Sequence, residues 1–161
     1  FPKNPVLRVM PNTPMLVRKG VAGIAANQLA QGEYAQLGVE MFNLVGRSYL
    51  LPENLIDPLT SVSGCSPAFA YLFIEAMADG GVEKGLPRDM AIQLAAQALA
   101  GSAEMVLQTG KHPAQLKDSV CSPAGSTIVG VHVLERGGFR GTVMNAVTES
   151  CDKMIEVGKK A

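Results

Sequence analysis

The first third of the chain alternates short apolar runs with proline, asparagine and glycine. Residues 6–10 (VLRVM) and 20–26 (GVAGIAA) have the length and boundaries of buried strands, and 48–51 (SYLL) is a third candidate. Between them, residues 33–46 place apolar side chains at helical spacing and close on a glycine. The pattern predicts the final part of an α/β unit rather than a whole one.

From about residue 55 the pattern changes to helices joined by tight turns. A helix at 66–81 is predicted to begin with Ser66 as its N-cap and to end on the glycine pair 80–81. Its interior is apolar nearly all round, so it must be buried on every side. A domain of about 100 residues rarely achieves such burial alone, and we therefore expect a partner chain to cover this helix.

Four more helices are expected after this apolar one. Residues 87–110 are rich in alanine and place Asp89 in the first turn, where a carboxylate is favourable. The other three are predicted at 112–120, 126–138 and 139–160. The fold class is therefore mainly α, with an α/β segment in front.

Composition and charge exclude several classes of function. The chain has 161 residues, 47% of them hydrophobic, which supplies a sizeable core. Lys and Arg number 14, and so do Asp and Glu, so no excess positive charge is available for a nucleic acid or an anionic membrane surface. No apolar run approaches the roughly 20 residues of a membrane span. We expect neither nucleic acid nor membrane as a partner.

The cysteines bear on the cellular compartment of this chain, and the glycines bear on nucleotide binding. The three cysteines are widely spaced and form no CxxC pair, which favours a reducing compartment and argues against a disulfide framework or a metal site. No GxGxxG motif follows a predicted strand. Because the chain opens on FPKNPVLRVM without an initiator Met, we expect it to be cut from a longer protein whose nucleotide-binding half lies upstream.

The stretch CSPAGSTI, residues 121–128, is a candidate anion site. Ser126 or Thr127 is expected to cap a helix whose first N–H groups are unpaired and whose dipole favours negative charge. Ala124 and Gly125 leave the backbone accessible, and Ser122 adds a hydroxyl. An ordinary N-cap after a tight turn explains the same residues, so the stretch alone leaves both interpretations open.

Several uncommon strings, in their order and spacing, resemble a known family. They are RVMPNTPMLVRKG, SVSGCSPAFAYLFIEAMADGGVEKGLPRDMAIQLAAQALAGSAEM, and HPAQLKDSVCSPAGSTIVGVHVLERGGFR followed by NAV. From about residue 7 to 153 the chain resembles the C-terminal part of pyrroline-5-carboxylate reductase. The resemblance implies NADPH- or NADH-dependent reduction of the C=N bond of Δ1-pyrroline-5-carboxylate to L-proline, the last step of proline biosynthesis.

The resemblance also implies a domain order. A Rossmann domain comes first, and a helical domain that interlocks with its twin in a homodimer comes second. Residues 1–56 would be the remnant of the first domain and 57–161 the helical dimerisation and substrate-binding domain. The cofactor would be bound mainly by the missing part, so this chain alone is expected to be inactive. A higher assembly of dimers and a cytoplasmic or mitochondrial location complete the implied picture.

Residue roles follow from the same resemblance. Ser122 and the backbone N–H groups of Ser126 and Thr127 would hold the substrate carboxylate, and the catalytic Thr127 hydroxyl would face the ring nitrogen. The implied substrate-binding set is Val120, Ser122, Ala124, Gly125, Ser126 and Thr127, and the implied cofactor contacts are Asn12 and Thr13.

Two stretches depart from the family pattern. Ala124 replaces a glycine, which would strain the loop by roughly 1 kcal/mol if that position needs a positive φ; we expect that it does not. Cys65 and Ser66 stand in a segment that commonly reads Ser-Gly-Ser-Gly-Pro-Ala, near the dimer contact.

Two other functions remain open at this point. The apolar helix fits a dimerisation module without catalysis equally well. A different dehydrogenase with Rossmann and helical domains would need a catalytic lysine, and Lys84, Lys111 and Lys117 lie near turns or on a short helix without that context. A protonated imine needs position more than a strong acid. His112 precedes a helical proline and His132 lies within a predicted helix beside apolar neighbours, so both are expected to be structural.

Overall fold

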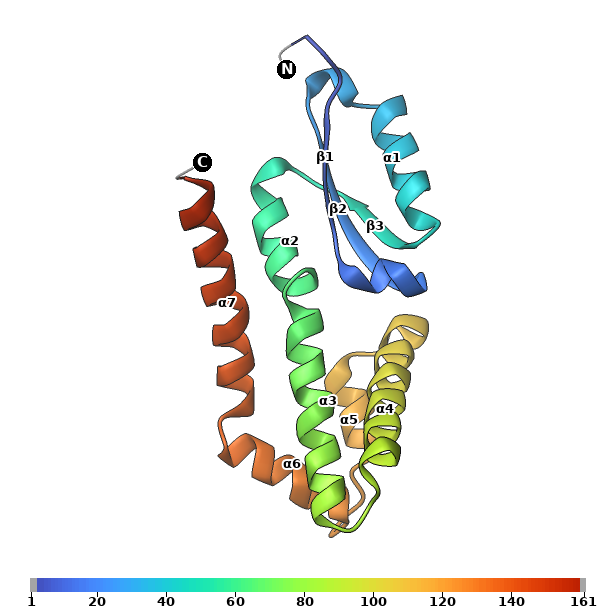
Figure 1. The fold of residues 1–161 in the computed structure, drawn as a ribbon, viewed down its shortest axis with the longest axis vertical. Coiled ribbons are helices and arrows are strands. Elements are labelled where there is room, and N and C mark those ends of the chain that lie inside the picture. Colours follow the sequence, from blue (N-terminus) through green and yellow to red (C-terminus); the bar gives the residue numbers. More distant parts are fainter. Residues whose placement is uncertain (1–2, 160–161) are drawn as a thin grey trace. The chain divides into compact units, whose positions relative to one another are not determined.

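In the computed structural model, residues 3–159 are described, and they form a three-stranded sheet and seven α-helices (Figure 1). By internal contacts the chain divides into two compact units. One contains the residues up to Phe69 together with those from Met144 onward, and the other is Ala70–Val143. Three short 3₁₀ helices connect elements in the first part of the chain: η1 Thr13–Val17, η2 Gln28–Ala30 and η3 Glu53–Leu55.

The sheet has the order β1-β2-β3. Strand β1 (Leu7–Pro11) runs antiparallel to β2 (Gly20–Ala26), and β3 (Gly46–Leu50) runs parallel to β2. Helix α1 (Glu33–Asn43) supplies the crossover between β2 and β3. The predicted strands are confirmed, with β2 matching to the residue.

Helices α1 and α2 (Ile56–Ser63) cover opposite faces of the sheet. A Cβ at Gly38 of α1 would lie 2.8 Å from Leu7 Cδ1 and 3.8 Å from Ile24 Cδ1. A Cβ at Gly23 would lie 2.8 Å from Leu59 of α2. Because neighbouring strand residues point to opposite faces, Ile24 and Gly23 mark two separate packing layers. Ile24 and Ile56 are the largest fully buried side chains.

The predicted helix at 33–46 is too long. Helix α1 ends at Asn43, and Gly46 is the first residue of β3. A Cβ at Gly46 would lie 2.1 Å from the carbonyl oxygen of Gly20, its partner across the two strands. Gly46 therefore permits the close approach of two strands and does not terminate the helix.

The remaining helices are α3 Ser66–Glu83, α4 Arg88–Thr109, α5 Pro113–Ser119, α6 Ser126–Arg136 and α7 Phe139–Gly158. Helix α3 differs from its prediction at both ends. The Ser66 hydroxyl donates back to the carbonyl of Val62 and so does not cap α3. The helix also continues through Gly81 and stops before Gly85, whose φ is +98°.

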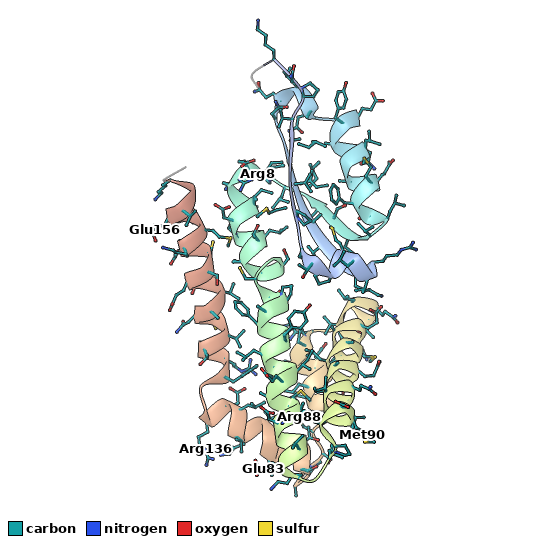
Figure 2. The ribbon with its side chains drawn as sticks, viewed as in Figure 1. Arg8, Glu83, Arg88, Met90, Arg136 and Glu156 are labelled. Carbon is teal, nitrogen blue, oxygen red and sulfur yellow. The ribbon has the colours of Figure 1, made fainter. Side chains whose placement is uncertain are left out.

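Few side chains of Ala70–Val143 are buried within this chain. The buried ones are all alanines, Ala78, Ala91 and Ala95. The rings of Phe73 and Phe139 pack with centroids 5.8 Å apart and join α3 to the first turn of α7. Large apolar side chains project from the helices instead, among them Leu72 at 68% exposure and Met90 at 51%, the latter labelled in Figure 2.

Helix α4 corrects the expectation that no apolar run approaches the length of a membrane span. By length and composition its 22 residues would suffice to cross a membrane, and this is true of no other helix in residues 3–159. The low polarity of this helix comes largely from alanine, so no long unbroken run of large apolar residues marks it in the sequence. Its exposed apolar residues also fit burial by a second protein chain.

Candidate functional site

A tight turn precedes helix α6 at the stretch CSPAGSTI. The Gly125 N–H donates to the carbonyl of Ser122 at 3.0 Å, and Ala124 has a φ of +59°. Proline at the second position and a positive φ at the third are the features of a type II turn. The expectation that Ala124 avoids a positive φ was therefore wrong, and an alanine here costs about 1 kcal/mol relative to an unstrained backbone.

Gly125 is the N-cap of α6, with φ −76° and ψ 166°. The prediction that Ser126 or Thr127 caps the helix was wrong, because the turn places the helix start one residue earlier. Ser126 and Thr127 are instead the first two helical residues, and no side chain caps the α6 N-terminus. Their N–H groups have no carbonyl partner inside the helix and form a small donor surface with positive potential.

Three hydroxyls lie close to these N–H groups along the chain. Ser122, Ser126 and Thr127 are all exposed, and none of their hydroxyls has a hydrogen-bond partner within residues 3–159. A Cβ built on Gly125 would lie 2.3 Å from the Ser122 hydroxyl oxygen, so this oxygen lies directly beside the helix start. The structure thus brings Ser122 and Gly125 together at the first turn of α6.

Val120 occupies a different place in this segment. It is the C-cap of α5 and is 63% exposed. It lines a hollow of about 370 Å³ in which Val106 and Leu116 also take part. Val120 therefore adds an apolar surface to the segment that leads into the turn.

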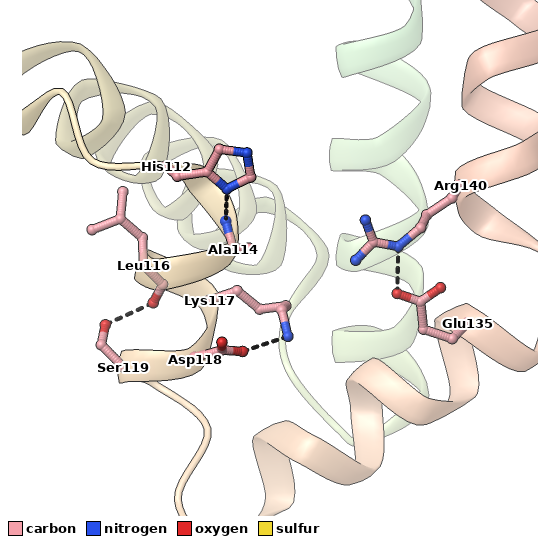
Figure 3. A network of polar contacts seen from close by, with 8 residues as sticks. All are labelled: His112, Ala114, Leu116, Lys117, Asp118, Ser119, Glu135 and Arg140. Atoms are coloured by element: carbon pink, nitrogen blue, oxygen red, sulfur yellow. Dashed lines mark hydrogen bonds and ion pairs between the residues drawn. The ribbon is translucent and has the colours of Figure 1, made fainter.

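Several charged and polar side chains near the turn, from α5 to α7, have partners of their own (Figure 3). His112 is the N-cap of α5, where its Nδ1 accepts from the Ala114 N–H at 3.2 Å, which agrees with the structural role expected for it. Lys117 donates to Asp118 at 2.6 Å, and this hydrogen bond raises the pKa of Lys117. Arg140 pairs with Glu135 at 2.6 Å. An anion at the turn would depend mainly on amide and hydroxyl donors.

The two residues expected near the cofactor belong to the other compact unit. The Asn12 amide donates to the Ser63 carbonyl at 2.9 Å, and its oxygen accepts from the Val21 N–H at 2.8 Å. Both polar ends of Asn12 thus tie the loop after β1 to β2 and to the end of α2. The neighbouring Thr13 is exposed.

Arg8 forms ion pairs that sequence reasoning missed. It donates a hydrogen bond to Glu53 and lies 3.5 Å from Asp57, and the bond to Glu53 is the main cause of its raised pKa. The two carboxylates lie 45 and 49 residues away, so no local pattern connects them to Arg8. These pairs fix β1 against the segment that begins α2.

Residues 3–159 do not form a complete binding site for a dinucleotide. A phosphate-binding turn between strand and helix uses three glycines, whereas the connection from β2 to α1, residues 27–32, contains one, Gly32. The Asn27 side chain in that connection is already bonded to the N–H groups of Val6 and Ala30. In residues 3–159 no cluster of three or more His, Cys, Asp or Glu is placed to hold a metal ion.

Comparison with known proteins gives a consistent result. The family model described as "Pyrroline-5-carboxylate reductase dimerisation" matches residues 53–157. The chain is 47% identical over 160 residues to the pyrroline-5-carboxylate reductase of Synechocystis sp., covering 99% of this chain and 60% of that protein. The enzyme of Glycine max is 48% identical over 151 residues, which cover 94% of this chain and 55% of the relative.

Solved structures agree with these relatives. A Plasmodium falciparum pyrroline carboxylate reductase with NADP bound is 40% identical, with a TM-score of 0.87. The match covers 94% of this chain and 61% of the Plasmodium chain. The pyrroline-5-carboxylate reductase of Coxiella burnetii is 32% identical, with a TM-score of 0.90. The match covers 94% of this chain and 57% of the Coxiella chain. The chain spans 60% or less of the length of the curated relatives named here.

Proposed function

The chain belongs to the pyrroline-5-carboxylate reductase dimerisation family, and on this premise we propose that it is part of an enzyme that reduces Δ1-pyrroline-5-carboxylate to L-proline with NADPH or NADH. The names of the relatives and the NADP in the Plasmodium falciparum structure support the reaction and the cofactor.

The turn into helix α6 is the observation that carries this proposal. The N–H groups of Ser126 and Thr127 are free of intrahelical partners, and the Ser122 hydroxyl lies beside them. A carboxylate is the right ligand for such donors, because the positive end of the helix dipole favours an anion. We assign the substrate carboxylate to this position, with Val120, Ala124 and Gly125 shaping the loop around it.

The Thr127 hydroxyl has the catalytic role in this proposal. A protonated imine is already electrophilic at carbon, so the reaction requires an orienting group and no strong acid. A hydroxyl at Thr127 can hold the ring nitrogen while the backbone N–H groups of Ser126 and Thr127 hold the carboxylate. The nicotinamide cofactor supplies the hydride, and residues upstream of this chain would bind most of it, with Asn12 and Thr13 near its reactive end.

The domain division proposed here is 1–56 for the Rossmann remnant and 57–161 for the helical domain. The start of the family match at residue 53 supports a boundary in this region. The exposed apolar residues of the helices support a homodimer in which each chain covers the other, and such dimers are proposed to assemble further. The same family membership supports our proposal of a cytoplasmic or mitochondrial location.

Thr127→Ala in the complete enzyme tests the site. Loss of the hydroxyl should raise KM or lower kcat by 10- to 100-fold, about 1.4 to 2.8 kcal/mol, while the melting temperature hardly changes. Ser126→Ala is the matched control, because its proposed contribution is the backbone N–H, which alanine keeps. Steady-state kinetics and thermal melting of both variants give the answer.

A dimerisation module without catalysis is the second candidate, because the exposed apolar helices favour it independently of the turn. If Thr127→Ala destabilises the protein while kcat/KM of the folded enzyme is unchanged, this second candidate becomes the better account.

A further inference from the structure

We propose that Gly125 is a positioning residue: its missing side chain leaves the space in which the Ser122 hydroxyl stands beside the first turn of α6. This inference rests on the proposed carboxylate site and names what holds one of its donors in place. The reason for a glycine at position 125 is steric and does not lie in its backbone conformation.

The backbone of Gly125 does not itself require glycine. Its φ of −76° and ψ of 166° lie in the extended region that every residue adopts. By contrast, Gly110 and Gly138 have φ values of +64° and +74°, where glycine is preferred for its conformation. A different reason must therefore favour glycine at 125.

The space around Gly125 supplies that reason. A Cβ at this position would lie 2.3 Å from the Ser122 Oγ, 3.1 Å from the Ser122 carbonyl oxygen and 3.6 Å from the Ser122 Cβ. The carbonyl oxygen is held by its hydrogen bond from the Gly125 N–H, so the hydroxyl is the atom that must move. Gly130, on the same helix, has nothing within 4 Å of its Cβ position.

An alanine at 125 is therefore expected to rotate the Ser122 hydroxyl away from the helix start. The N–H groups of Ser126 and Thr127 remain in place, since alanine keeps the backbone. The carboxylate site then loses one of its three donors without losing the turn, so substrate binding weakens while the fold persists.

A double-mutant cycle in the complete enzyme tests this coupling. Gly125→Ala, Ser122→Ala and the double variant are compared by KM for pyrroline-5-carboxylate, kcat and melting temperature, with Gly130→Ala as the control. We expect Gly125→Ala to raise KM about tenfold or more with Ser122 present, and less than about threefold once Ser122 is alanine. The melting temperature should fall equally in both backgrounds, because the N-cap preference for glycine over alanine does not depend on Ser122.

Two results would overturn the inference. If Gly125→Ala changes KM equally with Ser122 present and absent, Gly125 acts without Ser122. If KM does not change and a crystal structure of the variant shows Ser122 undisturbed, there is no steric coupling between the two residues. A crystal structure of the Gly125→Ala variant also separates this inference from the proposed function. A displaced Ser122 side chain with an unchanged KM would support the steric coupling and remove Ser122 from the substrate site.

Discussion

The sheet region and the Ala70–Val143 unit bury different kinds of residue. The sheet region encloses Ile24 and Ile56 completely, with one helix on each face. Ala70–Val143 encloses only alanines, and both regions leave leucine, methionine and tyrosine side chains exposed. A region that fills its own core is stable as one chain, whereas a region that buries only methyl groups needs apolar surface from elsewhere. The same chain thus combines a part with large side chains in its core and a part that buries only methyl groups.

The largest expected effect comes from a charge on the apolar helices. Leu72→Lys should raise the dimer dissociation constant about a thousandfold, about 4 kcal/mol, because an ammonium group would be buried without a partner. Leu44→Lys is the control, since this α1 C-cap residue is 76% exposed and belongs to the sheet region. Sedimentation measures both. An unchanged dimer in the Leu72 variant would show that α3 is not covered by a second chain.

A cavity in the sheet region should have the next largest effect. Ile24→Ala removes a fully buried side chain and should lower the free energy of unfolding by about 3 kcal/mol. The dimer dissociation constant should not change, because the sheet region fills its own core. Denaturant unfolding and sedimentation test the two parts of this prediction. A loss below about 1 kcal/mol would contradict the packing of β2 between two helices.

The third prediction concerns the hydrogen bonds by which Asn12 holds the loop after β1 within the sheet region. Asn12→Ala should cost about 1–3 kcal/mol of stability, because the Val21 N–H loses its acceptor and the Ser63 carbonyl its donor. Thr13→Ala should leave the melting temperature unchanged. A rise in KM for the cofactor in the Asn12 variant at unchanged melting temperature would instead point to a direct cofactor contact.

The smallest expected effect concerns strain at the turn. Ala124→Gly should stabilise the protein by about 0.5 kcal/mol, because relief of the positive φ outweighs the greater freedom of glycine in the unfolded chain. Thermal melting at matched concentration is the measurement. A destabilised variant would mean that the alanine methyl group contributes contacts that compensate for its strained backbone.

Local patterns predicted most elements but not all of their ends. Strand β2 follows from its unbroken apolar run with clear boundaries. The end of α3 was misplaced at Gly80 and Gly81, because glycine can sit inside a helix at modest cost. The real stop at Gly85 had a signal, since Pro87 follows it closely and cannot continue the preceding helix.

The site was predictable in its location and not in its geometry. The turn, its hydroxyls and the helix start follow from the residues of CSPAGSTI. Whether Ala124 takes a negative or a positive φ is not decided by Pro-Ala, because type I and type II turns both accept proline at the second position. The bonds of Asn12 to Ser63 and of Arg8 to Glu53 join residues about 50 apart, so only the folded chain shows them.

The order of the sheet has a consequence for handling this chain. Within residues 3–159, β1 and β3 are both edge strands, each with a partner on one side only. The free side of such a strand presents N–H and C=O groups on which a strand of another molecule can add. Arg47 on β3 places a charge on that edge strand, and charged side chains discourage such pairing, whereas the charge of Arg8 on β1 is already paired with Glu53 and Asp57. Neutralising Arg47 would therefore favour strand addition and turbidity at high protein concentration, a route to self-association that involves none of the apolar helices.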